Sequence, residues 1–348
     1  MPSRRVAVPI LTALCVVAGV VAHGVAGARN PDPAAADGFA ARIVAPGVIS
    51  TEADEVGAAF TPDGRTLYFT RRSPTTSTPT VSVIFVSRLA NGRWGTPEVA
   101  SFSGRYRDSS PALSPDGSRL FFLSYRPRDP GGKARDDADL WVAEATDSTH
   151  GRWSEPRNVG PPVNTDQNEG SPSVAADGTL YFSSDRKGGR GGFDIYRARP
   201  AGSGFAAPEN LGEAINTAAT ETHPAIAPDQ SFLVFVSFGR PEIALSGGFP
   251  YPRGDLYTSF RKDGNWQPAR NLGPAVNSAA TESNPCLAPD GKRLFFTSER
   301  GFAAVPMHAG LTIERFDKEM GGIFNGRGNL YEIPLARLGV AVVNAGER

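Results

Sequence analysis

A carboxylate and an arginine recur together five times along the chain of 348 residues. Each carboxylate stands eight residues before an Asp that is usually followed by Gly, and each arginine closely follows an aromatic or aliphatic run. The carboxylates are Glu55, Asp108, Glu169, Glu221 and Glu282, and the arginines are Arg72, Arg126, Arg186, Arg240 and Arg300. Gathered in one place, these side chains would form a charged ring that binds a cation or an anionic group. Alternatively they form carboxylate–guanidinium pairs that join one structural unit to the next, and their repetition favours this second interpretation.

Signals of catalysis are weak. The sequence contains neither a Gly-x-Ser-x-Gly nor a His-Glu-x-x-His motif. Glycoside hydrolysis uses two carboxylates at a set separation, but the acids of this chain are repeated rather than unique. Trp94, Trp153 and Trp266 recur at one position of the repeat, which indicates a structural role rather than sugar stacking. We therefore expect no catalytic residue.

One histidine interrupts the repeated pattern. His223 stands two residues after Glu221, where other copies carry Ser110, Ser171 and Asn284. Together with His308 it is a candidate metal ligand, but the spacing of the two matches no local metal motif. We expect a hydrogen-bonded polar side chain at His223, with neither a metal nor a cofactor.

The elements that must position these residues are themselves repeats. The anchor dipeptides are 53, 61, 52 and 61 residues apart, and they are Asp63-Gly64, Asp116-Gly117, Asp177-Gly178, Asp229-Gln230 and Asp290-Gly291. Each copy predicts four short strands: one before the hairpin turn at the anchor, an apolar one after it, a third that often begins at Asp, and a fourth after a Gly and an aromatic residue. Four antiparallel strands per copy are typical of a propeller blade, so the fold class is all-β.

The two ends of the repeat region predict how the ring closes. The fifth copy stops after its third strand, at residues 331–334, and residues 39–47 match the fourth strand of the preceding copy, at 266–274. The sequence therefore predicts a five-bladed β-propeller over residues 39–336, in which an N-terminal strand completes the last blade. Residues 337–348 are expected to form a tail. The alternative is six blades, with a degenerate one in residues 301–328.

A family resemblance follows from these motifs. The copies resemble WD40-like repeats of the Pro-Asp-Gly type, as in TolB-like periplasmic propellers, and most of all the version found beside OmpA-type domains. Residues characteristic of that version are Asn216-Thr217, Glu221, Pro224, Gly191-Gly192-Phe193-Asp194 and Glu209-Asn210-Leu211-Gly212. The resemblance covers residues 39–334 and implies a periplasmic or secreted binding scaffold. It does not fix a ligand, because propellers have many functions.

The first residues predict export. Arg4-Arg5, a nearly uncharged apolar stretch and the small residues Ala26-Gly27-Ala28 form a secretory signal peptide over 1–28, followed by a flexible lead-in over 29–38. If it is not cleaved, this stretch would instead anchor the protein in a membrane. The net charge is zero, which excludes a general nucleic-acid binder. We expect a bacterial protein of the periplasm or exterior that acts as a monomer.

The copies differ most in the loops between second and third strands, and binding residues concentrate on such loops. In residues 241–253 and 301–328, the latter with a helical turn at 312–319, the candidate binding residues are Phe249, Tyr251, Arg253, Met307, His308, Arg315 and Phe316. The alternative is that these loops only cover the propeller face. We expect a non-enzymatic scaffold that binds a protein or peptide partner through this loop-rich face. The second hypothesis is a carbohydrate-binding or glycoside-processing propeller that uses the charged channel mouth.

Overall fold

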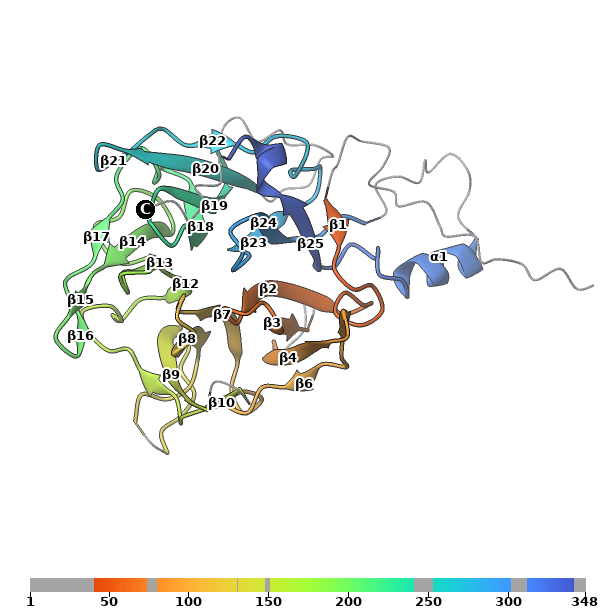
Figure 1. Cartoon of the computed structure of the whole chain (residues 1–348), viewed down its shortest axis with the longest axis horizontal. Helices are drawn as coiled ribbons and strands as arrows, with labels where there is room; N and C mark the ends of the chain where they lie inside the picture. Colours follow the sequence, from red (N-terminus) through yellow and green to blue (C-terminus); the bar gives the residue numbers. More distant parts are fainter. Residues whose placement is uncertain are drawn as a thin grey trace, which may run out of the picture. The chain divides into compact units, whose positions relative to one another are not determined.

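Five small antiparallel sheets surround a central axis as the blades of a β-propeller (Figure 1). The computed structural model describes residues 41–73, 80–129, 131–147, 151–240, 253–301 and 312–340, all within one compact unit, Ala34–Arg348. The expected signal peptide and lead-in lie outside the described residues. Within the described ranges no helix is long and apolar enough to cross a membrane.

Each blade begins with its innermost strand and proceeds outward. Blade 1 contains β2 (Asp54–Phe60), β3 (Thr66–Arg72), β4 (Ser82–Ala90), β5 (Arg93–Trp94) and β6 (Glu98–Val99). Blade 2 contains β7 (Asp108–Leu113), β8 (Arg119–Ser124), β9 (Asp139–Asp147), β10 (Arg152–Trp153) and β11 (Arg157–Asn158). Blade 3 contains β12 (Glu169–Val174), β13 (Leu180–Ser184), β14 (Asp194–Ala198) and β17 (Glu209–Asn210), with a small hairpin of β15 (Pro200–Ala201) and β16 (Gly204–Phe205). Blade 4 contains β18 (Thr220–Ile226), β19 (Phe232–Phe238), β20 (Gly254–Lys262), β21 (Asn265–Trp266) and β22 (Arg270–Asn271).

Blade 5 is assembled from both ends of the described chain. It contains β23 (Glu282–Leu287), β24 (Arg293–Ser298), β25 (Asn329–Pro334) and β1 (Arg42–Ile43). Strand β1 pairs antiparallel with β25, with Ile43 opposite Tyr331, and the Val44 amide donates to the Leu330 carbonyl at 2.8 Å. The predicted closure by an N-terminal strand is confirmed. The described part of residues 301–328 contains helix α1 (Ile313–Met320) rather than a sixth blade.

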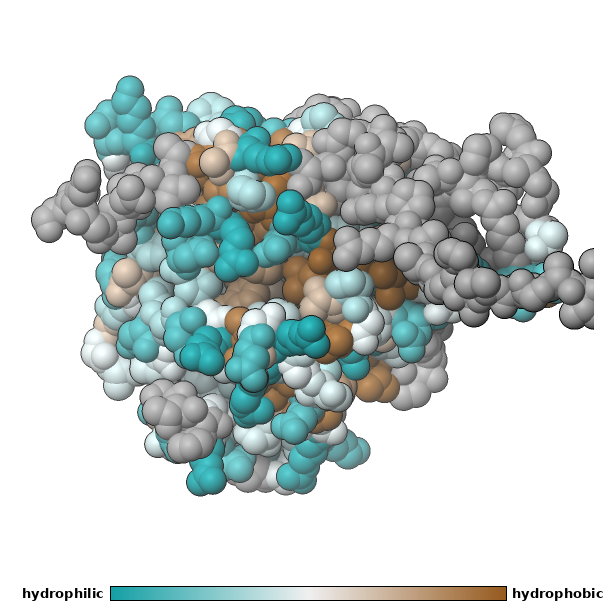
Figure 2. Space-filling view, turned by 45° about the vertical axis from the view of Figure 1, so that its right-hand side comes forward, coloured by the Kyte–Doolittle hydropathy of each residue, from teal (hydrophilic) through white to brown (hydrophobic). Residues whose placement is uncertain are grey.

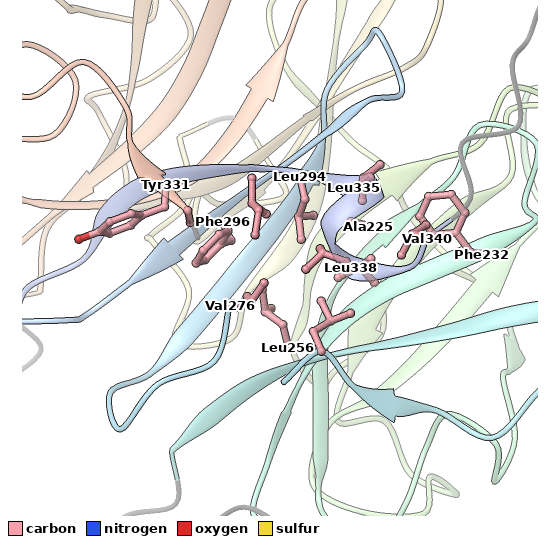
Figure 3. Close-up of a cluster of buried hydrophobic side chains, with 14 of the residues drawn as sticks. Ala225, Phe232, Leu256, Val276, Leu294, Phe296, Tyr331, Leu335, Leu338 and Val340 are labelled. Atoms are coloured by element: carbon pink, nitrogen blue, oxygen red, sulfur yellow. The ribbon is translucent and has the colours of Figure 1, made fainter. Parts of the chain in front are cut away.

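The core lies between blades rather than within one of them. Buried hydrophobic side chains form five clusters, and each cluster combines residues from two neighbouring blades. Between blades 4 and 5, Phe232 and Leu256 pack in one cluster with Phe296 and Tyr331 (Figure 3). Strands such as β19 are apolar on both faces because each face meets another sheet. The side of the unit seen in Figure 2 is mostly hydrophilic, with hydrophobic residues visible mainly in recesses.

The packed structure extends past the expected boundary at residue 336. A 3-10 helix, η3 (Leu335–Leu338), follows β25 directly. Leu335, Leu338 and Val340 are buried in the cluster between blades 4 and 5 (Figure 3). The described part of the expected tail therefore covers the core, because these apolar side chains would otherwise be exposed to water.

Asparagine side chains hold the link between blades 3 and 4. The Asn216 side chain bonds both backbone groups of Ile195, with its Oδ1 accepting at 2.8 Å and its Nδ2 donating at 2.9 Å. Asn210 donates to the Asp194 carboxylate at 2.7 Å. Corresponding asparagines, Asn164 and Asn277, make the same contacts with the third strands of blades 2 and 4. These residues therefore stabilise the blades, and they do not line the described cavities of the channel.

Candidate ligand site at the wide end of the channel

The repeated carboxylates are buried beneath the channel mouth rather than displayed around it. All five of these residues have 0% relative exposure. Three of the expected arginines pair with them directly: Arg126 with Asp108 at 2.9 Å, Arg186 with Glu169 at 3.3 Å and Arg240 with Glu221 at 3.2 Å. The same arginines donate to the carbonyls of Phe102, Val163 and Ile215, in the links from the preceding blades. These contacts tie each blade to its predecessor, which is a structural role.

Blade 1 departs from this pattern. Arg71, not Arg72, pairs with Glu55, at 3.0 Å. The strand register explains the exchange, because position 71 lies directly opposite Glu55, where blade 2 places Ser124 opposite its own acid. Arg72 instead contacts Asp54 at 2.7 Å and Glu299 of blade 5 at 3.2 Å. In blade 1 the arginine that pairs with the repeated acid is therefore Arg71, and Arg72 connects blades 1 and 5 instead.

Burial shifts the titration of the repeated acids. Desolvation raises the pKa of Glu55, Asp108 and Glu169, although hydrogen bonds and the nearby arginines oppose this effect. In blade 5 burial raises the pKa of Glu282 to about 7, while hydrogen bonds from Ser278 and Ser298 and the positive charge of Arg300 lower it. These groups are closed off from ligands, so their shifts affect stability rather than binding.

A ring of five residues with left-handed backbone narrows the channel below the mouth. Each innermost strand contains a register shift of the β-bulge type. At the bulges, left-handed backbone with φ between 49° and 67° occurs at Gly57, Ser110, Ser171, His223 and Asn284. These five residues line one narrow section of the channel. The repeats of the sequence place Ser110, Ser171, His223 and Asn284 at the same position, but they do not predict a β-bulge there.

The bulges also join neighbouring blades. The Gly57 amide donates to the Thr297 hydroxyl at 3.1 Å, and the Ser110 amide donates to the Thr70 hydroxyl at 3.2 Å. The His223 amide donates to the Ser183 hydroxyl at 3.2 Å. Each bond runs from the innermost strand of one blade to the second strand of the blade before it. The strained backbone thus gains a buried partner.

The two ends of the channel differ in size and chemistry. The wide end is a cavity of ≈ 640 Å³, lined by Arg72, Arg107, Tyr125, Asn168, His223 and Glu299 among others. Loops between second and third strands contribute Thr80, Ala138 and Phe193 to it. The other end is a cavity of ≈ 200 Å³, lined by prolines and by Phe60, Leu113, Val174, Ile226 and Leu287. The wide end is therefore the end of the described channel at which charged side chains line the cavity.

Five residue pairs form the rim of the wide end, and every blade supplies a different pair. In each pair the residue before the repeated acid faces a residue at or just past the end of the second strand. The rim pairs, in blade order, are Asp54–Arg72, Arg107–Tyr125, Asn168–Asp185, Thr220–Phe238 and Thr281–Glu299. Sequence reasoning missed them, although the signal was present: these positions vary between segments that otherwise repeat.

Most rim charges have partners in the rim itself. Arg72 binds the carboxylates of Asp54 and Glu299, and the Asp185 carboxylate accepts bonds from the Asn168 amide and side chain at 2.7 and 2.9 Å. Burial raises the pKa of Glu299, although the positive charge of Arg72 opposes the shift. The rim carboxylates of blades 1, 3 and 5 are thus ion-paired or hydrogen-bonded within the rim.

Blade 2 is the exception. The exposed Arg107 places its guanidinium carbon 3.9 Å from the centroid of the Tyr125 ring. Within the described residues Arg107 forms no ion pair.

The single histidine of the bulge ring is a neutral hydrogen-bonding group. Burial, assisted by the positive charge of Arg72, lowers the pKa of His223 to about 4. Its Nδ1 lies 2.8 Å from the Thr222 hydroxyl. In the part of the chain that the structure describes, no three His, Cys, Asp or Glu side chains gather in a way that would hold a metal ion.

The candidate loop residues are described only in part. Arg253 is half-buried and directly precedes β20. Arg315 and Phe316 belong to α1, which confirms the predicted helical turn in this loop. Phe249, Tyr251, Met307 and His308 lie outside the described residues.

Comparisons with known proteins agree on the fold alone. No family model and no curated protein matches the chain. An α-L-arabinofuranosidase from Lactobacillus brevis superimposes with a TM-score of 0.50 at 14% identity, covering 82% of this chain and 92% of that one. A puromycin-hydrolysing peptidase from Mycobacterium tuberculosis gives a TM-score of 0.40 at 17% identity over 75% of this chain, which spans only 35% of the peptidase. At 14% identity the likeness to the arabinofuranosidase shows the propeller fold alone and carries no activity to this chain.

Proposed function

We propose that this protein is an exported, non-enzymatic propeller of the TolB-like kind, which binds a protein or peptide partner at the wide end of its channel. The observation that carries the proposal is the rim, where a repeated blade frame presents five different residue pairs, and at least one member of each pair lines one cavity of ≈ 640 Å³. A cavity of this size lies within the range of roughly 300–1,000 Å³ in which proteins hold compact ligands. It would take a few residues of a peptide, with the rest of the partner resting on the surrounding loops.

The chemistry of the lining fits a peptide. Ser109, Ser171 and Asn284 line the cavity with groups that both donate and accept hydrogen bonds, as a peptide backbone requires. Phe193 and Phe238 add half-buried aromatic surface at the same cavity. Polar groups that fix orientation beside apolar surface that supplies affinity are the usual composition of a recognition site.

The carboxylates of the lining argue against glycoside hydrolysis as the first choice. That reaction uses two carboxylates, one on each side of the scissile bond. Of the two carboxylates that line the described cavity, the Glu169 side chain has 0% exposure and Glu299 has 34%, with Arg72 bound to it. We therefore keep carbohydrate processing as an outcome of the test rather than as a second proposal.

A blocking substitution tests the proposal. Peptides would be selected on the purified protein from a random display library, and their affinities measured for the wild type, Ser109→Trp and Ser118→Trp. Ser109 lines the wide cavity, whereas Ser118 is exposed at the hairpin turn of the same blade, toward the opposite end. We expect Ser109→Trp to weaken binding at least tenfold and Ser118→Trp to leave it unchanged.

Three results would contradict the proposal. They are a library that yields no binder, a binder that Ser109→Trp does not affect, and turnover of a glycan in a screen for released reducing sugar. Export is tested separately by cell fractionation with antibody detection. Recovery of the full-length chain in the cytoplasm alone would contradict it.

A further inference from the structure

We infer that the wide end of the channel contains a subsite for a carboxylate, formed by Arg107 with Tyr125 beneath it. This inference rests on the proposed function, because it names one chemical feature of the peptide that would bind there. The observation behind it is the uneven charge of the rim, in which blade 2 alone contributes a cation that no rim carboxylate binds among the described residues.

The guanidinium of Arg107 is held in position before any ligand arrives. Its carbon lies 3.9 Å from the centroid of the Tyr125 ring, within the range of a cation–π contact. The Tyr125 amide donates to the Arg107 carbonyl at 3.1 Å, so the backbones of the two residues are also fixed to each other. A guanidinium that lies over a ring with its face keeps N–H donors at its edge, and these can bind a carboxylate in bidentate geometry.

Neighbouring charges do not satisfy Arg107. Arg72 takes both Asp54 and Glu299, and the Asp185 carboxylate is hydrogen-bonded to Asn168. Glu169 also borders the cavity, but its side chain is fully buried and bound by Arg186. In the described rim the carboxylates therefore already have partners, whereas the exposed guanidinium of Arg107 has no carboxylate bound to it.

Two aromatic side chains in the lining indicate which kind of group accompanies the carboxylate. Blade 4 contributes Phe238 to the rim, and Phe193, in the loop before β14 of blade 3, also lines the cavity. Neither aromatic carries a charge, and each is half-buried, so both offer surface to an apolar group. A peptide segment with an acidic group next to an aromatic or aliphatic residue matches both the guanidinium and the aromatic surface.

Three short peptides test the inference and separate two sources of the carboxylate. Acetyl-Ala-Ala-Phe has a free C-terminal carboxylate, acetyl-Ala-Asp-Phe-amide has a side-chain carboxylate, and acetyl-Ala-Asn-Phe-amide has no charge. Binding would be measured by titration at low ionic strength, because salt screens an exposed ion pair. We expect at least one anionic peptide to bind at least tenfold more tightly than the neutral peptide, and the better one identifies the source.

Two arginine variants locate the effect. Arg107→Gln should reduce the preference for the anionic peptide to less than twofold. Arg105→Gln is the matched control, because Arg105 is also exposed and also lies over a tyrosine, Tyr106, at 5.5 Å, but does not line the cavity. We expect this control to keep the full preference. Circular dichroism of both variants would show whether the fold is retained.

The failure of the subsite and the failure of the proposed function give different results. Equal affinity for charged and neutral peptides, no measurable binding of any of the three, or a preference that survives Arg107→Gln would each overturn the carboxylate subsite. Peptides selected from the display library that Ser109→Trp rejects would still support the proposed function in all of these cases.

Discussion

The guanidinium carbon of Arg107 lies over the Tyr125 ring at the rim of blade 2, 3.9 Å from the ring centroid. A cation–π contact of this kind at a partly exposed site contributes roughly 0.5–1 kcal/mol. We predict that Tyr125→Leu weakens binding of the anionic peptide by about two- to fivefold, because Arg107 keeps its charge but loses its fixed orientation. The same titration measures it. A loss as large as that of Arg107→Gln would show that Tyr125 contacts the ligand itself.

Removing a repeated acid should destabilise the propeller strongly. Glu221→Ala leaves Arg240 buried without its carboxylate, and breaking a buried pair in this way costs about 3–5 kcal/mol. The control is Glu209→Ala, which removes an exposed carboxylate paired with Arg197 and Arg199 and should cost less than about 1 kcal/mol. Urea denaturation gives both free energies of unfolding. Equal losses would contradict a structural role for the repeated pairs.

Glu282 should make the fold less stable as the pH rises. Its pKa in the folded protein is about 7, above the ordinary value of 4.5, so folding favours the protonated form. Its contribution is present below pH 4.5 and is lost as the pH increases through 7. We predict that Glu282→Gln flattens the pH dependence of the free energy of unfolding between pH 5 and 8, whatever its effect on absolute stability. Glu209→Gln, as the exposed control, should leave that slope unchanged.

His223 should act in the opposite direction. Its pKa of about 4 in the folded protein lies below the ordinary value of 6.5, so the unfolded chain binds the proton more readily. The contribution of His223 is therefore present above pH 6.5 and is lost as the pH falls toward 4. His223→Asn removes this loss and suits the left-handed backbone, since Asn284 occupies the same position in blade 5. Parallel pH profiles for the variant and the wild type would refute the prediction.

The hydroxyl of Thr297 should strengthen the closure of the ring. It accepts the bond from the Gly57 amide, which links blade 5 to blade 1 in a buried position. Thr297→Val preserves the shape of the side chain but leaves that amide unsatisfied, at a cost of about 1–3 kcal/mol. Thermal denaturation would report the loss. Thr96→Val, at an exposed position of blade 1, is the control and should have a much smaller effect.

The blades could be predicted because their signals are local. An Asp-Gly turn followed by residues such as Leu180, Tyr181 and Phe182 specifies a hairpin within a few residues, and five copies specify the ring. The closure of the ring could also be predicted, because the last copy of the repeat lacks a fourth strand and a matching strand precedes the first copy. The resemblance to TolB-like propellers stays a prediction, because no family model tests it.

The candidate site was less accessible to sequence reasoning. Which residues face each other at the rim depends on the pairing register, and each innermost strand changes register at a bulge. A single offset moves Arg72 away from Glu55 and toward Asp54 and Glu299. The exposure of a charged side chain also depends on its depth in the channel. Glu169 is the repeated acid of blade 3 and is buried, whereas Arg107 stands one residue before the repeated acid of blade 2 and is exposed.

The pairing of β1 with β25 has a consequence for the order of folding. The Ser50 hydroxyl and the Leu330 carbonyl bond across 280 residues of sequence, so this contact forms late in a chain that builds its blades in succession. Until then the five blades form an open arc. Strand β25 has an unpaired edge, and the face of blade 1 that packs against blade 5 in the closed ring is exposed. Such edges are sites at which other chains add strands. Dilution during refolding should therefore favour the closed monomer, and crowding should favour strand exchange between molecules.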